Sequence, residues 1–174
     1  MNNLIGERLK LRKWQLTDIP QLVQGLNHSD MAIRYGTDYP YTDENARIYI
    51  EDAILNNKDK FAIILKEKNL VIGGCGLHCV NGKVSGNLWI ANKYQHRGLG
   101  TEAAILLVKY CFEKYDINQM DNFFYKGNDA SRRMQKKIGS HILEEVETNM
   151  GKSRIKAVLK REDFFNKLNN GDNR

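Results

Sequence analysis

Residues 95–103, with the sequence QHRGLGTEA, place two glycines between an apolar stretch and an amphipathic helical pattern. The apolar stretch at 88–91 predicts a strand, and the helical pattern begins at Thr101. A strand, a glycine turn and a helix N-terminus in this order form an anion site, because the first N–H groups of a helix lack partners and its dipole is positive there. Glycines also let the backbone approach a ligand closely. We therefore expect a pyrophosphate to be bound by Gln95, His96, Arg97, Gly98, Leu99, Gly100 and Thr101.

This glycine motif differs from the two common phosphate-binding loops. A Walker loop requires Gly, four residues and then Gly-Lys-Ser/Thr, and the sequence has no such string. A dinucleotide fingerprint requires three glycines early in a βαβ unit, whereas Gly98 and Gly100 lie past the middle of the chain. The alternative without a ligand is an ordinary glycine turn between two elements.

The composition limits the class of protein. The 174 residues suffice for one domain with a sizeable core, and 41% hydrophobic and 28% charged residues are typical of a globular protein. No apolar run reaches the roughly 18 residues of a membrane span, and no signal peptide is visible at the N-terminus. The three cysteines, an odd number without framework spacing, fit a reducing compartment. We therefore expect a cytoplasmic protein with no membrane partner.

The segment 75–79, CGLHC, raises the question of a metal site. In a strand, Cys75 and Cys79 share one face while His78 points to the other. No second pair of ligands occurs at zinc-like spacing. We expect buried structural thiols and no metal.

The net charge of +6 raises the question of a nucleic-acid partner. The basic residues are scattered and show no aromatic interleaving, which argues against such a partner. A local cluster falls on adjacent helical positions beside the glycine motif, where a multiply phosphorylated ligand or a solvated helix face accounts for it: Arg132, Arg133, Lys136 and Lys137.

The rest of the chain alternates strand and helix patterns with no repeat or linker. Thr17 is the expected N-cap of the first helix, residues 42–44 (TDE) are expected to open the second, and Asn81-Gly82 predicts a hairpin turn. Residues 1–168 form the expected domain, and the polar tail at 169–174 is expected to fray. Strands are expected at 9–12, 61–65, 70–80, 84–91, 120–125, 143–146 and 155–159, the last two joined across 149–152, and helices at 17–27, 42–55, 101–115, 129–138 and 162–168.

The pattern Gln-x-x-Gly-x-Gly followed by Thr-Glu-Ala resembles the acetyl-coenzyme A pyrophosphate loop of the GNAT acetyltransferase superfamily. Matches at 7–12 (ERLKLR), 89–91 (WIA), 128–131 (NDAS) and 136–139 (KKIG) make the chain most similar to the branch that includes the N-terminal acetyltransferases of ribosomal proteins. The element order is also that of the GNAT fold. The resemblance implies a single α/β (α+β) domain whose mixed, largely antiparallel central sheet has about seven strands flanked by helices, and it also suggests a homodimer.

The resemblance implies acetyl-CoA as cosubstrate and an N-acetyltransferase that works by direct attack in a ternary complex. Backbone groups of Leu88, Trp89 and Ile90 would pair with the pantetheine arm, and an N–H of this strand would polarise the thioester carbonyl. The Gln95 side chain would support the loop or the phosphate, and Arg97 would meet a phosphate unless it is a solvated surface charge.

Asn128 and Ser131 are the expected functional residues of the next helix. The resemblance implies that Asn128 contacts the cofactor and that Ser131 hydrogen-bonds or protonates the leaving thiolate. Asn128 is equally explained as a helix N-cap. Many relatives carry a tyrosine acid on this helix, where this sequence has Met134 and Lys137. Ser131 is therefore the candidate catalytic residue.

The general base is not evident. Family members often place a glutamate on the fourth strand, but this sequence reads VSGNL at 84–88. His78, Glu102 and a water relay are the alternatives, and Glu102 is also ordinary first-turn capping chemistry. An α-amine of pKa near 8 is roughly a fifth neutral at pH 7.4, against about a thousandth for a lysine amine. A site without a strong base therefore favours a protein N-terminal α-amine.

The acceptor side would be lined by the aromatic segment 33–41 and the second helix, unless these simply pack as a loop. Its few carboxylates, Asp38, Asp43 and Glu44, argue against a polyamine or an aminoglycoside as the alternative acceptor. From another class, the chain could be a non-catalytic CoA-binding regulatory module. The presence of the glycine motif together with Asn128 and Ser131 argues against that alternative.

Overall fold

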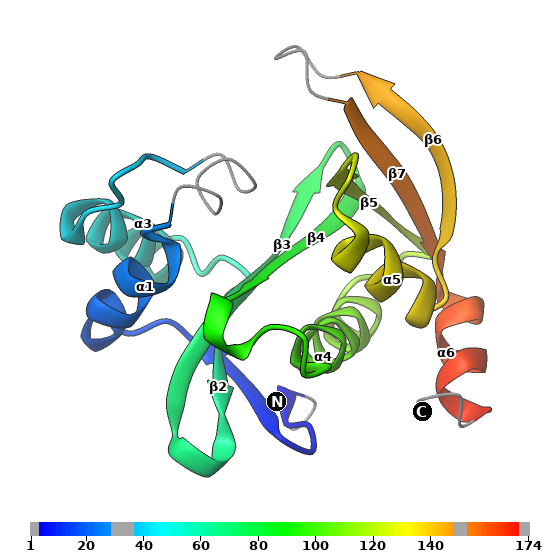
Figure 1. The fold of residues 1–174 in the computed structure, drawn as a ribbon. Coiled ribbons are helices and arrows are strands. Elements are labelled where there is room, and N and C mark those ends of the chain that lie inside the picture. Colours follow the sequence, from blue (N-terminus) through cyan, green and yellow to red (C-terminus); the bar gives the residue numbers. More distant parts are fainter. Residues whose placement is uncertain (1–3, 29–36, 148–152, 171–174) are drawn as a thin grey trace.

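The computed structural model describes residues 4–28, 37–147 and 153–170. Figure 1 shows helices on both faces of a twisted layer of strands. The strands are β1 (Leu9–Lys13), β2 (Lys60–Leu65), β3 (Leu70–Val80), β4 (Lys83–Ile90), β5 (Gln119–Tyr125), β6 (His141–Glu147) and β7 (Ser153–Lys160). The helices are α1 (Ile19–Leu26), α3 (Asp43–Leu55), α4 (Leu99–Lys114), α5 (Asp129–Lys137) and α6 (Arg161–Asn169).

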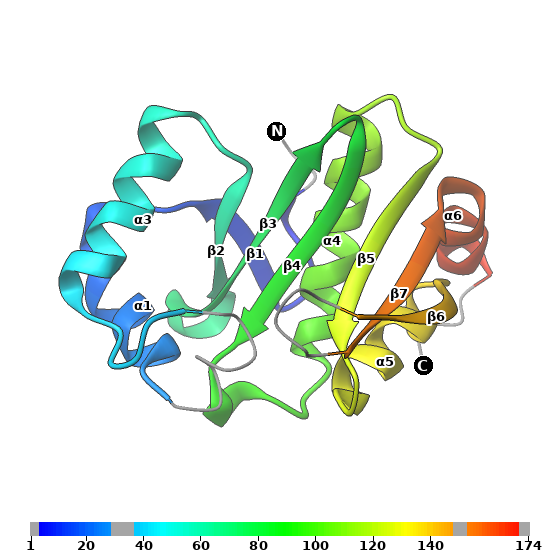
Figure 2. The same ribbon diagram turned by 90° about the horizontal axis from the view of Figure 1, so that it is seen from above.

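The strands form two hydrogen-bonded sheets, with the orders β1-β2-β3-β4 and β5-β7-β6 and antiparallel pairing within each. β4 and β5 are the facing edge strands. Figure 2 shows them side by side, pointing the same way and lying farther apart at their carboxyl ends. The α/β class and the seven largely antiparallel strands are thus confirmed, and the sheet is divided because β4 and β5 diverge.

The first sheet is covered on both faces. Along β2, Phe61, Ile63 and Leu65 belong to the core beneath α4, whereas Ala62 and Ile64 belong to a second core beneath α1 and α3. This alternation follows from the two-residue period of a strand. A strand that is apolar on both faces, as β2 is, must be buried on both.

β3 is continuous although it contains three glycines, at 73, 74 and 76. Of these, Gly74 makes room for the ring of Trp89, which lies in the second core. A Cβ added at Gly74 would lie 2.8 Å from Trp14 Cζ2 and from Trp89 Nε1, and one added at Gly25 of α1 would collide with the same indole. The glycines at 25 and 74 therefore leave the space that the side chain of Trp89 fills in the second core.

Some local signals are confirmed. The Thr42 Oγ1 accepts from the Asn45 N–H at 3.2 Å and caps α3. Asn81 and Gly82 have φ values of 50° and 74°, as the turn between β3 and β4 requires. Cys75 and Cys111 are buried, as predicted.

Other local signals were misleading. Thr17 is not a cap: α1 begins at Ile19, after a 3-10 turn at Leu16–Asp18. The side chain of Asp18, and not that of Thr17, makes the hydrogen bonds at this turn. Its carboxylate accepts from the Gln15 N–H at 2.9 Å and from Arg12 at 2.6 and 2.8 Å. Cys79 is exposed, not buried, because it lies near the projecting end of β3.

The turn predicted at 149–152 and Tyr35 of the aromatic segment lie outside the described residues. None of the helices at 4–28, 37–147 or 153–170 is long and apolar enough to cross a membrane. The same ranges hold no group of three His, Cys, Asp or Glu side chains suited to a metal ion.

Asp59 connects the start of β2 to the end of α4. Its carboxylate, 6% exposed, accepts from Tyr110 Oη at 2.8 Å, Tyr115 Oη at 2.6 Å and Lys114 Nζ at 2.7 Å. Burial raises the pKa of the Asp59 carboxyl, but the hydrogen bonds from Lys114, Tyr115 and Tyr110 outweigh it and leave the pKa below its ordinary value. The folded state therefore favours the ionised form.

We expect Asp59→Asn to lower the free energy of unfolding by about 2 kcal/mol at pH 7, less than for a fully buried pair because Lys114 is partly exposed. A carboxyl whose pKa is depressed by folding stabilises above its unfolded pKa of about 3.9 and loses that contribution as the pH falls. The difference between variant and wild type should therefore shrink below about pH 4. Urea unfolding at both pH values, with the more exposed Asp52→Asn as control, measures this. Equal losses in both variants would contradict it.

Candidate active site

The glycine loop closes on itself before α4 begins. Gln95 Nε2 donates to the Ile90 carbonyl at 2.8 Å and to Asn92 Oδ1 at 3.1 Å, so this side chain supports the loop. Gly98 caps α4 with φ 75°, a left-handed conformation that favours glycine. The helix thus begins at Leu99, two residues before the predicted start, and presents its first N–H groups at the loop.

Glu102 fastens this loop to β1. Its Oε1 accepts from the N–H groups of Arg8 and Leu9 at 2.8 and 3.0 Å, and its Oε2 accepts from Arg8 Nε at 2.9 Å. Arg8 Nη1 in turn donates to the Arg97 carbonyl at 2.9 Å. Both carboxylate oxygens are therefore used on the β1 side, which excludes Glu102 as a proton acceptor for a reaction in the cavity described next.

A cavity of about 690 Å³ lies between β4, β5, α4 and α5, within the size range of ligand sites. It brings together most of the predicted residues: Leu88, Ile90, Gln95, His96, Gly98, Gly100, Thr101, Asn128 and Ser131. Three others do not line it. Trp89 and Leu99 turn their side chains into the cores, and Arg97 lies with its guanidinium carbon 5.9 Å from the Tyr94 ring.

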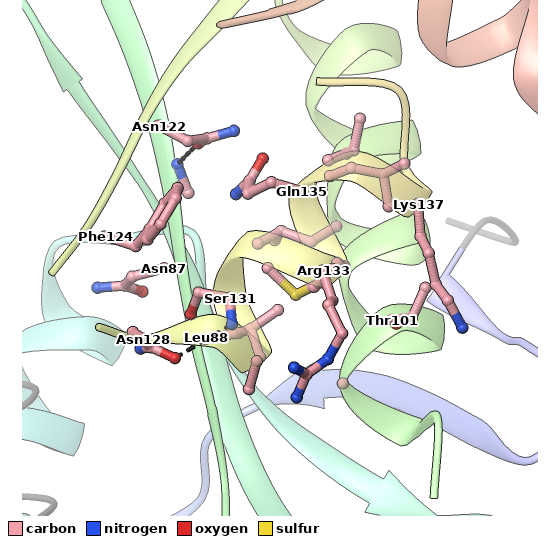
Figure 3. Close-up of a pocket in the computed structure, with 18 of the residues that line it drawn as sticks. Asn87, Leu88, Thr101, Asn122, Phe124, Asn128, Ser131, Arg133, Gln135 and Lys137 are labelled. Carbon is pink, nitrogen blue, oxygen red and sulfur yellow. Dashed lines mark hydrogen bonds between the residues drawn. The ribbon is translucent and has the colours of Figure 1, made fainter. Parts of the chain in front are cut away.

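The start of α5 forms one wall of the cavity. Asn128 Oδ1 accepts from the Ser131 N–H at 3.1 Å, so the capping interpretation of Asn128 is confirmed. Figure 3 shows Asn128 and Ser131 opposite Asn87 and Leu88 of β4. Because Asn128 also lines the cavity, capping leaves open the predicted contact with a ligand.

The basic cluster on α5 divides between two faces. Arg133 and Lys137, four residues apart, line the cavity, and Figure 3 shows them projecting on the side where Thr101 lies. Arg132 instead places its guanidinium 5.7 Å from the Phe124 ring. Two of the four cations are thus placed to meet an anion held at the start of α4.

Sequence reasoning missed a buried asparagine in the wall. Asn122 of β5, 3% exposed, accepts from the Gly86 N–H of β4 at 2.9 Å and joins the two sheets where the strands are close. The signal would have been a polar side chain inside a buried strand. Arg154 of β7 was also missed: it lines the cavity and lies 5.2 Å from the Tyr125 ring.

The described lining contains no carboxylate. Its ionisable side chains are His78, His96, Tyr125, Arg133, Lys137 and Arg154. Such a lining suits a ligand with several negative charges, and the glycine loop adds the N-terminal dipole of α4 at one end.

Residues 8–141 match the family described as Acetyltransferase (GNAT) domain. The chain is 31% identical over 129 residues to the uncharacterized N-acetyltransferase p20 of Bacillus licheniformis, covering 70% of this chain and 72% of that one. It is 25% identical over 139 residues to the uncharacterized N-acetyltransferase YnaD of Bacillus subtilis, covering 79% and 81%. A GNAT acetyltransferase structure from Bacillus anthracis superposes with a TM-score of 0.84 at 20% identity, covering 91% and 98%.

The chain therefore belongs to the GNAT acetyltransferase family. It is an acetyl-CoA-dependent N-acetyltransferase, and acetyl-CoA is its cosubstrate. A structural neighbour, aminoglycoside acetyltransferase AAC(6')-Ib in complex with coenzyme A, has a TM-score of 0.75 at 20% identity, covering 91% of this chain and 98% of that one.

We expect Gly98→Glu to raise the Kd for acetyl-CoA at least about tenfold, because like charges brought together in a binding site cost several kcal/mol. Gly82→Glu is a matched control. Its φ of 74° imposes the same backbone strain, but an added Cβ there meets nothing within 4 Å. Calorimetric titration of both folded variants measures the difference. Equal Kd values would show that the loop does not contact the phosphates.

Proposed function

We propose that the protein acetylates the α-amine of a peptide or protein N-terminus, with acetyl-CoA and peptide bound together in the cavity between β4 and β5. The absence of carboxylates from the described lining carries this proposal. A polyamine or aminoglycoside acceptor would present several positive charges to a lining that offers no described carboxylate to receive them and that keeps Arg154 as a cation, once Arg133 and Lys137 are assigned to the phosphates. A single α-amine carries at most one positive charge and loses its proton more easily than a lysine amine, so it meets no such conflict.

The position of the cosubstrate follows from the walls of the cavity. The pyrophosphate would lie on the N–H groups at 96–100, since the Thr101 N–H donates to the Gly98 carbonyl, and Arg133 and Lys137 would reach its phosphates from α5. The pantetheine arm would pair with the backbone of β4 at 88–90, because β4 is an edge strand and its N–H and C=O groups on this side have no neighbouring strand.

The reaction would then take place near Leu88, where β4 and the start of α5 face each other across the cavity. The amine attacks the thioester carbonyl, whose developing negative charge an N–H of β4 would stabilise. The C–N bond forms, the C–S bond breaks, and the hydroxyl of Ser131 would supply a proton to the sulfur. Ser131 is suited to this role because the cap of α5 fixes its backbone at the cavity wall.

The names of two similar proteins point to two different classes of acceptor. YdaF of Bacillus subtilis, named as a candidate ribosomal N-acetyltransferase, is 26% identical over 156 residues, with 84% of each chain covered. The neighbour AAC(6')-Ib is an aminoglycoside acetyltransferase. The lining of this cavity favours the first kind of acceptor.

An acceptor panel tests the proposal. Peptides with free Ser or Ala N-termini should release CoA thiol faster than the same peptides blocked at the N-terminus but carrying a lysine, and faster than spermidine or an aminoglycoside. The reason is the larger neutral fraction of an α-amine and the cationic lining. Preferred acetylation of the polycations would overturn the proposal while leaving the acetyltransferase activity intact.

Replacing the Ser131 hydroxyl tests whether Ser131 supplies the proton that the leaving sulfur takes up. We expect Ser131→Ala to lower kcat by about 100-fold, the scale of general acid catalysis, with the Kd for acetyl-CoA almost unchanged. Ser131→Thr, which keeps a hydroxyl, should restore part of the rate. Initial rates and calorimetric Kd values measure both. If rate and affinity fall together in Ser131→Ala, Ser131 is a binding residue.

A further inference from the structure

We propose that His78 of β3 accepts the proton that the acceptor amine loses, with Asn87 of β4 fixing the orientation of its imidazole. This inference rests on the proposed function. It answers the question left by the fourth strand, where residues 84–88 contain no carboxylate.

Elimination points to His78. Among the described lining residues, the two histidines are the side chains able to accept a proton near neutral pH, because the remaining ionisable groups are arginine, lysine and tyrosine. His96 lies in the glycine loop with φ 61°, where the pyrophosphate is expected. Glu102 is held on the β1 side. His78 is left on the wall that an incoming amine can reach.

The position of His78 along the sheet suits the reaction. His78 pairs with Ser85 in the β3–β4 register, and both line the cavity with Asn87. β4 runs from these residues through Leu88 to the glycine loop. The phosphates at the loop and a pantetheine arm along 88–90 would therefore direct the thioester toward Asn87 and His78.

Asn87 holds the ring by one nitrogen. Asn87 Nδ2 lies 2.9 Å from His78 Nε2. By rotating its amide, an asparagine can donate to a bare Nε2 or accept from an Nε2–H. As the amide lies, Nδ2 donates to a bare Nε2 and the ring proton is on Nδ1. A half-turn of the amide places Oδ1 against Nε2–H, which leaves Nδ1 to take a proton, and that contact persists in the imidazolium. Asn87 is thus a positioning residue that serves both protonation states.

The surroundings keep the imidazole neutral before the reaction. Partial desolvation and then the positive charges of Lys60 and Lys58 lower the pKa of His78 below its usual 6.5. Both lysines pair with Asp52 of α3, at 3.1 and 2.6 Å, which moderates their effect. Ser85 and Asn87, which face His78 from β4, carry no charge. At pH 7 the ring is ready to accept a proton.

The proton balance is complete. The amine nitrogen gives one proton to His78 as it bonds to the acetyl carbon, and the thiolate released by cleavage of the C–S bond takes one proton from Ser131. His78 then releases its proton to solvent, and Ser131 regains one from solvent. The net products are the amide and CoA thiol.

His78→Gln, measured on the full-length protein with the best α-amine peptide, tests the proposal. We expect kcat to fall about 100-fold with the Kd for acetyl-CoA unchanged. The kcat of the wild type should decline below a pKa under 6.5, and in the variant this acidic limb should disappear. His141→Gln is the matched control, because His141 pairs with Asp163 at 3.0 Å and does not line the cavity.

Asn87→Asp gives a second readout, the pH at which kcat declines. A purely structural role of Asn87 would leave that pH unchanged. A carboxylate beside the ring favours the imidazolium, so the acidic limb of kcat should shift to higher pH. If His78→Gln keeps the wild-type kcat and the same decline of kcat at acidic pH, His78 is not the proton acceptor. If the wild type acetylates only amines of another class, the proposed function fails, and the same variants then test His78 with that amine.

Discussion

The bond between Asn122 and Gly86 sets the geometry on which the site depends. β4 and β5 run the same way and face each other, yet they belong to different hydrogen-bonded sheets. A side chain, not a backbone ladder, joins them at this point, and it is 3% exposed. Beyond it the strands diverge and leave the edge of β4 available to a ligand. A full ladder between β4 and β5 would have occupied the edge of β4 to which we assign the pantetheine arm.

The two ends of the cavity are built by different means. The loop end relies on backbone geometry: the left-handed Gly98, the side chain of Gln95 closing the loop and the first turn of α4. The opposite end relies on side chains from β3, β4 and β5. In the proposed binding mode, the first kind of construction would recognise phosphate groups common to many ligands, and the second could vary to suit the acceptor.

The sequence predicted the parts that depend on short-range signals. The glycine motif, the cap at Thr42 and the Asn81-Gly82 turn involve residues a few positions apart, and all three are found in the structure. It did not predict contacts between distant segments. Asn122 and Gly86 are 36 residues apart, and Glu102 and Arg8 are 94 apart, so neither pairing leaves a local pattern. Thr17 shows the limit of local reasoning too, because Asp18 forms the better set of hydrogen bonds.

The anchorage of the loop by Glu102 has a consequence for how this chain can diverge. Two of the three bonds of Glu102 go to the main-chain N–H groups of Arg8, just before β1, and Leu9, its first residue, and every residue except proline supplies such a group. The hydrogen bond from the Leu9 N–H to Glu102 therefore does not depend on which side chain residue 9 carries, as long as that side chain fills the core. It depends instead on the spacing of the chain, because a one-residue shift would turn every side chain of β1 to the other face. Substitutions should accumulate in β1 more readily than insertions or deletions.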